Sequence, residues 1–532
     1  MIGADRLTSA LPAAGDAACG AGEVSGCAGE PFAAVAETHS AVVFFAGDRA
    51  YKLKKPVALG FLDFTSPQAR AAACQREAEL NRRFAPGVYL GVAEIRGPDG
   101  RICDHLVVMR RMPAGRRLSA LVTARAPVDG GLRQVARVLA AWHAAAPRSP
   151  QIAAQGSHDA LWARWQANIG QARESCGHLL EAAGLDEIER LAGRFTAGRA
   201  RLFAGRITAG RVVDGHGDLL ADDIFCLDDG VRILDCLEFD DRLRWLDGLD
   251  DACFLAMDLE RLGAPELASR FTGWYAEYSG DPAPASLRRH YVAYRAFVRV
   301  KVACLQAARG DGNAAAQAWQ LAGITLRHLR AGAVTLVLAG GLPGTGKTAL
   351  AGALADRLGF TVLSSDRIRK ELAGVPAGQR CAAPWGTGIY TAARTEQVYS
   401  EMLGRAGRLL ALGESVIADA SFVSAAHRAA AAATAAAAHA DLVQVRCTAP
   451  AAVAGQRLAA RSAGISDADE AIARRMAAVE VPWREAVTVG TGQPPAVPGQ
   501  PPDAVIQQAM EAIRPHRPEP VRHPARPILL PD

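Results

Sequence analysis

The sequence has little excess charge of either sign. Its 532 residues carry a formal net charge of +5. Nucleic acids and anionic membrane surfaces attract strongly basic chains, so this small imbalance favours neither of them as the main partner. We expect no membrane partner and no nucleic acid, and the sequence leaves the oligomeric state open.

Long hydrophobic runs are missing as well. No stretch approaches the ~18 consecutive apolar residues of a membrane-spanning helix. Residues 1–30 are rich in alanine and glycine but lack the apolar core of a secretory signal, so we expect a flexible leader there. These absences predict a cytoplasmic protein.

The cysteines show no regular spacing. All 11 are scattered, without a CxxC pair or the Cys/His spacing that marks a zinc site. An odd number without a framework predicts reduced thiols in a cytosol. We therefore expect neither a disulfide framework nor a structural zinc site.

The strongest positive signal is a glycine-rich phosphate-binding loop at residues 341–348. It lies between an apolar strand expected over 334–339 and a helical pattern over 347–358. Strand, loop and helix form the context that this motif requires, because inward N–H groups and the helix N-terminus attract phosphate. Lys347 is expected on the β- and γ-phosphates of ATP, and the hydroxyl of Thr348 on Mg²⁺. The predicted nucleotide-binding residues of the loop are Gly341, Gly344, Thr345, Gly346, Lys347 and Thr348.

Two carboxylates follow later strands of this half. Asp366 comes after a strand at 360–363, and Asp419 ends a strand at 415–418. Open α/β sheets bind ligands at the carboxyl ends of their strands. Asp366 is therefore a candidate base for an acceptor hydroxyl, with a plain helix cap as the alternative. Asp419 is a candidate Mg²⁺ ligand or an ordinary loop acid, and Arg369 could bind an anionic substrate group.

Arginines near the end of this half suggest a lid. Arg457 and Arg461 are four residues apart and share a helix face. With Arg474 and Arg475 they flank a polar stretch at 462–469. The arginines either close over the phosphates or are simply solvated.

From about residue 336 to 481 the chain resembles the small P-loop kinases of the gluconate kinase, zeta toxin and polynucleotide kinase kind. The resemblance rests on the loop at 341–348, on the Ser365-Asp366-x2-Arg369 pattern and on the strand that ends in Asp419. It implies an α/β P-loop NTPase fold with a parallel sheet. It also implies that the carboxylate at Asp366 activates the acceptor hydroxyl.

A second motif lies in the first half of the chain. His216, Gly217 and Asp218 are followed by Asp223, by a strand at 231–234 and by Asp235. This order is similar to that of the aminoglycoside phosphotransferase and choline kinase family. The resemblance implies an α+β protein-kinase-like fold in which Asp218 faces the acceptor hydroxyl and Asp235 binds Mg²⁺. Asp223 replaces the family's Asn; it can still ligate Mg²⁺, but it adds negative charge.

Upstream, a predicted hairpin at 42–45 and 50–54 carries Lys52 and Lys54 on one strand face. Lys52 is our candidate for the phosphate-binding lysine, and Lys54 remains an alternative. Glu77, on a later helix, is the candidate ion-pair partner or an exposed glutamate. No GxGxxG loop precedes this hairpin.

A helix predicted over 291–308 carries two further candidates. Arg295 and Arg299 share one face of this helix. They could bind an acidic acceptor, and a solvated basic face is the alternative.

We predict a leader at 1–30, an aminoglycoside-phosphotransferase-like domain at 31–329, a P-loop kinase domain at 334–513 and a Pro-rich disordered tail at 514–532. The combination resembles the bacterial bifunctional aminoglycoside phosphotransferase/ATP-binding proteins. The predicted activity is ATP- and Mg²⁺-dependent phosphate transfer to the hydroxyl of a small molecule of unknown identity, at two sites. In the alternative, the first half is a ligand-sensing pseudokinase that regulates the P-loop half.

Overall fold

The computed structural model describes residues 32–38, 40–58, 63–176, 179–308, 311–376, 379, 386–460, 469–492 and 501–513. The predicted leader and tail, and Arg461, lie outside these residues. The chain divides into two compact units, Met1–Arg82 with Pro86–Pro113, and Arg83–Ala85 with Ala114–Asp532.

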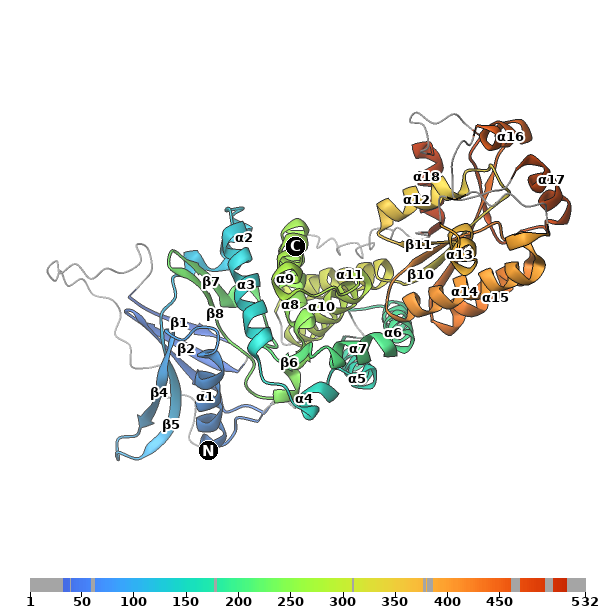
Figure 1. Ribbon diagram of the computed structural model, residues 1–532. Helices are drawn as coiled ribbons and strands as arrows, with labels where there is room; N and C mark the ends of the chain where they lie inside the picture. Colours follow the sequence, from blue (N-terminus) through green and yellow to red (C-terminus); the bar gives the residue numbers. More distant parts are fainter. Residues whose placement is uncertain are drawn as a thin grey trace, which may run out of the picture. The chain divides into compact units, whose positions relative to one another are not determined.

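The first unit, here called the N-terminal lobe, is a five-stranded sheet in the order β1-β2-β3-β5-β4, with every neighbouring pair antiparallel. The predicted hairpin is confirmed as β2 and β3. Helix α1 of this lobe begins after the N-cap Ser66, whose side chain accepts a hydrogen bond from the N–H of Ala69. The elements are β1 (Ala33–Glu37), β2 (Ala41–Ala46), β3 (Arg49–Lys54), α1 (Pro67–Asn81), β4 (Tyr89–Arg96) and β5 (Ile102–Arg110). Figure 1 shows α1 along this sheet, and it packs against β4 and β5.

The second unit starts with a helical lobe, comprising α2 to α11 and two short two-stranded antiparallel sheets, β6–β9 and β7–β8. Its elements are α2 (Leu118–Thr123), α3 (Asp129–Ala145), α4 (Pro150–Ala154), α5 (His158–Cys176), α6 (Ala182–Gly198), α7 (Ala200–Thr208), β6 (Val212–Asp214), β7 (Ile224–Leu227), β8 (Gly230–Ile233), β9 (Trp245–Asp247), α8 (Gly248–Arg261), α9 (Pro265–Ser279), α10 (Ala285–Ala307) and α11 (Ala314–Ala331). Most of α8 is buried, because α9 and α10 pack against it, with smaller contacts from α3, α11 and β9.

One expectation about the cysteines is wrong. Cys304, on α10, is disulfide-bonded, so the thiols are not all reduced. Free thiols among the described residues are Cys74, Cys103, Cys226, Cys236, Cys253 and Cys447. Within the same described residues, no helix is both long enough and apolar enough to span a membrane.

The remainder of the second unit, here called the P-loop domain, contains a five-stranded sheet in the order β11-β12-β10-β13-β14, with all pairs parallel. Its elements are β10 (Thr335–Gly340), α12 (Lys347–Leu358), β11 (Thr361–Ser364), α13 (Ser365–Leu372), α14 (Ala392–Ala411), β12 (Val416–Asp419), α15 (Ala425–Ala437), β13 (Asp441–Thr448), α16 (Ala451–Ala459), α17 (Glu470–Val479), β14 (Val487–Gly490) and α18 (Asp503–Ile513). The predicted fold class, a kinase-like α+β fold followed by an α/β P-loop fold, is confirmed.

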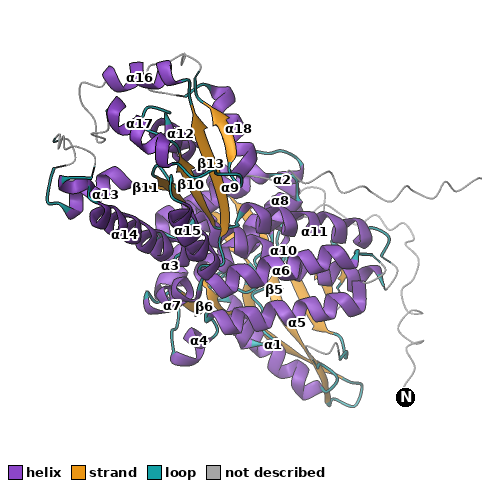
Figure 2. Ribbon diagram, turned by 90° about the vertical axis from the view of Figure 1, so that its right-hand side faces the viewer, coloured by secondary structure: helices purple, strands orange, loops and turns teal. Residues whose placement is uncertain are grey.

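Helices cover both faces of the parallel sheet. In Figure 1, α12 and α18 lie on one side of it, and α14 and α15 on the other. The core beneath α12 and α18 joins Leu350 and Leu354 to Val337, Ile417 and Val445 of the central strands. Figure 2 shows the strands enclosed by these helices. Burial on both faces explains why the central strands β10 and β12 are mostly apolar and could be predicted from the sequence.

The helical lobe packs against the edge of this sheet where the strands begin. Arg199 Nη1 donates to the carbonyl of Ala438 at 2.7 Å, and Ser286 Oγ donates to the carbonyl of Gly413 at 2.7 Å. Gly413 precedes β12 and Ala438 precedes β13. The opposite edge, where the strands end, is therefore left for the phosphate-binding loop.

Candidate functional site

The phosphate-binding loop follows β10 directly and can be built only with glycine at key positions. Gly341, Gly344 and Gly346 have φ values of +137°, +83° and +81°. A Cβ at Gly341 would lie 2.5 Å from the carbonyl oxygen of Cys447, and one at Gly344 would lie 2.6 Å from that of Ala454. Gly346 is the N-cap of α12, so the loop ends on the positive end of a helix dipole.

Thr348 and Asp419 meet beside this loop. Thr348 Oγ1 donates to Asp419 Oδ2 at 2.8 Å, and Asp419 ends β12, in register with Ala339 of β10. A hydroxyl and a carboxylate at this point suit Mg²⁺, which usually keeps several waters and shares phosphate oxygens. The described residues contain no group of three or more His, Cys, Asp or Glu side chains able to hold a metal alone. The residues present fit a cation held jointly with a nucleotide.

Lys347 supplies positive charge to the loop. Its side chain is half-buried at the start of α12 and makes no hydrogen bond or ion pair to any described residue. The positive charge of Lys347 acts to lower the pKa of the nearby Cys447 thiol. Burial has the larger effect and raises that pKa to about 12. The ammonium group is therefore available to a phosphate.

Asp366 lies close to the Thr348–Asp419 pair. Ser364, the last residue of β11, is in register with Asp419, and α13 begins immediately afterwards. Ser364 occupies the N-cap position of α13, so the alternative that Asp366 caps this helix is wrong. The Asp366 carboxylate is half-buried and has no hydrogen-bond partner among the described residues. It is free to accept a proton from a substrate.

Arg369 is held rigidly one turn further along α13. Its Nη1 donates to the carbonyl of Ile389 at 3.0 Å and to Thr395 Oγ1 at 3.2 Å, and its guanidinium lies 4.9 Å from the ring centre of Tyr390. Its buried Nε has no hydrogen-bond partner among the described residues. That unused N–H can donate a hydrogen bond to an oxygen atom.

The sequence interpretation missed Tyr399, which lies on α14 and contacts the same region. Burial raises the pKa of Tyr399, and the charges of Arg369 and Asp366 are both close enough to influence it. Its hydroxyl accepts a hydrogen bond from the N–H of Phe422 and is 3.3 Å from Ser421 Oγ. No motif marks Tyr399 or Thr395, because α14 reaches the site only through tertiary packing.

The predicted lid arginines differ in their environment. Arg457, on α16, lies against the phosphate-binding loop: its Nη2 donates to the carbonyl of Thr491 at 2.6 Å and its Nη1 lies 3.5 Å from that of Gly344. Arg474 is exposed and pairs with Glu470 of its own helix. Arg461 lies outside the described residues, so only Arg457 is located beside the loop.

In the N-terminal lobe, both candidate lysines contact Glu77. Lys52 Nζ lies 2.9 Å from Glu77 Oε1, and Lys54 Nζ lies 2.6 Å from Glu77 Oε2. The Glu77 side chain is fully buried, so the alternative of an exposed glutamate is wrong. Lys54 is 3% exposed and lies over the ring of Phe64, whereas Lys52 is 13% exposed. The greater access of Lys52 favours it for contact with a phosphate.

In the helical lobe, Asp251 fixes the backbone that precedes Asp218. The N–H of His216 donates to Asp251 Oδ2 at 2.7 Å, and that of Gly217 to Oδ1 at 2.9 Å. Burial alone would raise the pKa of Asp251, but hydrogen bonds and charge from His143 and His216 hold it below its ordinary value. Asp251 is therefore a structural anchor of the loop that leads into Asp218.

Asp218 itself is half-buried, and burial raises the pKa of its carboxyl group. The positive charge of Arg299 opposes this rise, whereas the charge of Asp235 adds to it. A carboxylate with a raised pKa is a better proton acceptor for a hydroxyl.

The β7–β8 hairpin brings Asp223 and Asp235 to the same end. Asp223 immediately precedes β7, and Asp235 follows β8 by one intervening residue. The N–H of Leu234 donates to the carbonyl of Asp223 at 2.9 Å, and Asp235 has a φ of +61° that turns the chain after the strand. The two carboxylates provide oxygen ligands of the kind that Mg²⁺ prefers.

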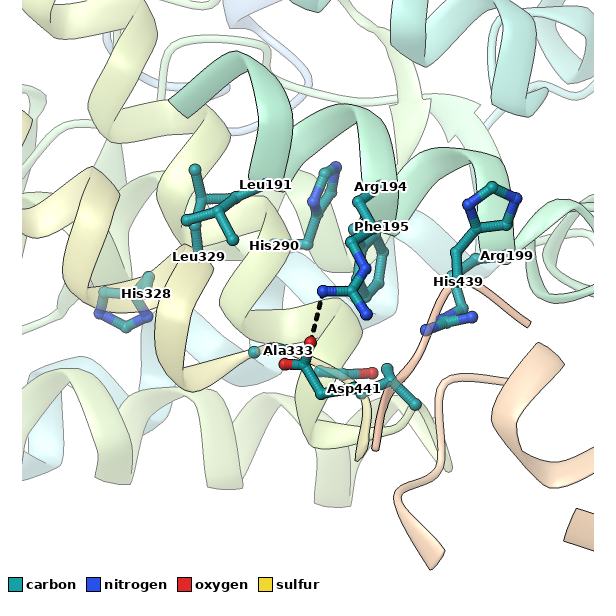
Figure 3. Close-up of a pocket in the computed structure, with 13 residues that line it drawn as sticks. Leu191, Arg194, Phe195, Arg199, His290, His328, Leu329, Ala333, His439 and Asp441 are labelled. Atoms are coloured by element: carbon teal, nitrogen blue, oxygen red, sulfur yellow. Dashed lines mark hydrogen bonds and ion pairs between the residues drawn. The ribbon is translucent and has the colours of Figure 1, made fainter. Parts of the chain in front are cut away.

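A cavity between the helical lobe and the start of the sheet is not a substrate site. Figure 3 shows Arg194 pointing to Asp441, with which it forms an ion pair. The cavity holds about 20 Å³, which is room for roughly one water molecule. We therefore assign it to packing between the two parts.

Comparisons with known proteins follow this division of the chain. The family model of the AAA domain matches residues 336–482, which contain the phosphate-binding loop. A choline/ethanolamine kinase family protein from Mesorhizobium loti is 16% identical, covers 57% of this chain and 92% of its own, and has a TM-score of 0.36. A gluconokinase from Sinorhizobium meliloti is 18% identical, covers 34% of this chain and 91% of its own, and has a TM-score of 0.24. Strand order and connection, rather than these scores, establish the two folds.

Long matches come from mycobacteria. An uncharacterized protein of Mycobacterium tuberculosis, Rv2004c, and its counterpart in Mycobacterium bovis are each 44% identical over 467 residues, which is 87% of this chain and 93% of theirs. Identity at this level across both halves means that this chain belongs to the same family as Rv2004c.

Proposed function

We propose that this protein is an ATP-dependent phosphotransferase that phosphorylates a hydroxyl group of a small molecule, with the P-loop domain as its principal active site. The observation that carries the proposal is the unpaired Asp366 carboxylate beside the Thr348–Asp419 pair. Phosphoryl transfer needs a phosphate cradle, charge neutralisation and an oriented nucleophile, and this edge of the sheet has a residue for each.

In this proposal the loop N–H groups and Lys347 bind the β- and γ-phosphates of ATP. Thr348 and Asp419 would hold Mg²⁺, which neutralises the phosphate charge when it is bound. Asp366 accepts the proton of the acceptor hydroxyl as its oxygen attacks the γ-phosphorus and ADP leaves. Arg369, one turn after Asp366 on α13, supplies positive charge that would position an anionic group of the acceptor.

The kinase-like half forms a second proposed site. In the first unit, Lys52 would bind phosphates with Glu77 as its ion-pair partner. In the second unit, Asp218 would act as the base, and Asp223 and Asp235 would hold Mg²⁺. The pseudokinase alternative is favoured by the extra negative charge of Asp223, which adds repulsion next to a polyanion. Asp218-dependent turnover in a full-length chain that carries Lys347→Ala separates these two possibilities.

Asp366→Asn tests the principal site. The amide cannot accept the proton, so transfer of labelled phosphate from ATP into a pool of small metabolites should fall by roughly 10²-fold or more. ATP binding, measured by equilibrium dialysis, should be unchanged because Asp366 forms no hydrogen bond or ion pair with the described residues of the loop. Asp356→Asn, at an exposed acid of α12, is the matched control. Equal transfer by Asp366→Asn and the wild type would remove Asp366 from the mechanism.

A further inference from the structure

The two arginines on one face of α10 have different environments. Arg295 is buried, and its Nε and Nη2 each donate to the carboxylate of Asp250 at 2.7 Å. Its guanidinium also lies 4.9 Å from the ring centre of Phe254. The charge of Arg295 is therefore neutralised inside the helical lobe and is not available to a ligand.

Arg299, one helical turn further on, has no such partner. Its side chain is half-buried and forms no hydrogen bond or ion pair with the described residues. Partly burying a guanidinium without a partner is unfavourable, because lost hydration is not replaced. An anionic ligand would replace it.

The start of α8 connects α10, which carries Arg299, to the loop that leads into Asp218. Asp250 binds Arg295 of α10, and the adjacent Asp251 binds the N–H groups of His216 and Gly217. Neighbouring residues of one helix thus fix both α10 and the loop that leads into Asp218. Further along α8, Asp258 accepts the N–H of Ala221, so the loop runs beside this helix past Asp218.

The electrostatics agree with this geometry. Among the charged groups around Asp218, Arg299 has the largest effect, and it offsets part of the rise in pKa that burial produces. Asp235, the acid that also affects Asp218, lies after β8, on the side proposed for Mg²⁺. The cation beside the proposed base therefore comes from α10.

We propose that Arg299 binds an anionic group of the molecule that is phosphorylated at Asp218, so that the acceptor of this second site is a hydroxylated anion. The proposal rests on the proposed function of the second site. A polycationic acceptor such as an aminoglycoside would place ammonium groups near Arg299 and meet like charge. A hydroxy acid would instead pair with Arg299 while its hydroxyl faces Asp218.

The test uses the full chain with Lys347→Ala, which silences the P-loop site. Gluconate, glucose and glucosamine share a polyol scaffold and differ in charge, and each is offered with labelled ATP. We expect Asp218-dependent transfer to gluconate with kcat/KM at least about tenfold above glucose, and less to glucosamine. Adding Arg299→Ala should raise KM for gluconate by roughly 10- to 100-fold with little change in kcat, as expected for a charged hydrogen bond. Arg299→Lys should restore part of the affinity.

Arg288→Ala is the control, because it removes the same charge from α10 about 16 Å from Arg299. It should leave the gluconate KM unchanged. Preference for glucosamine over gluconate, or an unchanged gluconate KM in Arg299→Ala, would overturn the proposal.

A binding measurement separates the proposed anion site at Arg299 from the proposed kinase activity at Asp218. Calorimetric titration with gluconate in the absence of ATP should show binding that Arg299→Ala weakens. Arg299-dependent binding without Asp218-dependent turnover supports the anion site and removes the kinase activity of the second site. Absence of gluconate binding together with absence of turnover counts against Arg299 as a ligand-binding residue.

Discussion

His290 illustrates how a single buried side chain links the fold to pH. The Nε1–H of Trp165 donates to His290 Nε2 at 3.2 Å, and the imidazole stacks on Phe195 with ring centres 4.3 Å apart. Because Nε2 accepts this bond, the neutral ring carries its proton on Nδ1. Burial, assisted by the charge of Arg199, lowers the pKa of His290 to about 3. The folded protein therefore keeps this histidine neutral at pH values where an unfolded chain would protonate it.

His290 should make the stability of the protein fall in acid. Below pH ~6.5 His290 binds a proton in the unfolded state but stays neutral in the folded state. The free energy of unfolding therefore decreases as the pH falls towards 3. The loss from this residue approaches about 1.4 kcal/mol per pH unit. His290→Gln keeps an acceptor for Trp165 but cannot titrate, so urea midpoints between pH 7 and 5 should change less steeply. His158→Gln, at a histidine with far more solvent access, should retain the wild-type slope; equal slopes in all three proteins would contradict the assignment.

At the scale of elements, strands and their following loops were predictable, whereas the helices that complete the site were not. The apolar runs before Gly341, Asp366 and Asp419 mark parallel strands, and the carboxyl ends of such strands meet at one edge. Tyr399 and Thr395 carry no comparable signal, since α14 joins the site through packing. The different roles of Arg295 and Arg299 also needed the structure. The sequence places both arginines on one helix face, and only the structure shows that Asp250 pairs with Arg295.

The phosphate-binding loop permits a sharp test of backbone geometry. Gly344 has a φ of +83°, and a Cβ there would lie 2.6 Å from the carbonyl oxygen of Ala454 in α16. Gly344→Ala adds about 1–2 kcal/mol of backbone strain. The added Cβ would also push the loop away from α16. The affinity of the P-loop site for ATP should therefore fall roughly tenfold or more.

Gly352→Ala is the matched control for that substitution. Gly352 lies in α12, and a Cβ there would meet nothing within 4 Å. Calorimetric titration with ATP should find wild-type affinity in this variant. Wild-type affinity in Gly344→Ala would mean that the loop tolerates the side chain and that its conformation in the bound state differs.

At the scale of the whole molecule, contacts within the second unit show that its helical lobe and P-loop domain pack against each other. Arg199 is buried there with Nη1 on the carbonyl of Ala438, and its Nε has no hydrogen-bond partner among the described residues. Burial and the nearby charge of Arg194 lower the pKa of Arg199 to about 10. This contact uses the edge where the strands begin, so the proposed P-loop active site remains accessible at the other edge. No sequence motif predicted this packing. The helical lobe and the P-loop domain meet through backbone carbonyl groups, and through Gly198, where the lack of a side chain permits the close approach.

Gly198 is the position at which this packing can be tested. It is the last residue of α6, and a Cβ there would lie 2.5 Å from the carbonyl oxygen of Ala438 and 3.0 Å from the Cβ of His439. The obstacle is backbone, so Gly198→Ala must push the two parts apart and weaken the bond from Arg199. We expect a loss of about 1–3 kcal/mol, seen as a lower urea midpoint for the second unit. Gly205→Ala, in α7 with open space around it, should instead be neutral or stabilise by about 0.5–1 kcal/mol. Opposite signs in two alanine substitutions seven residues apart would identify the contact with Ala438 as the cause, whereas stabilisation by both would show that the helical lobe and the P-loop domain do not pack in this way.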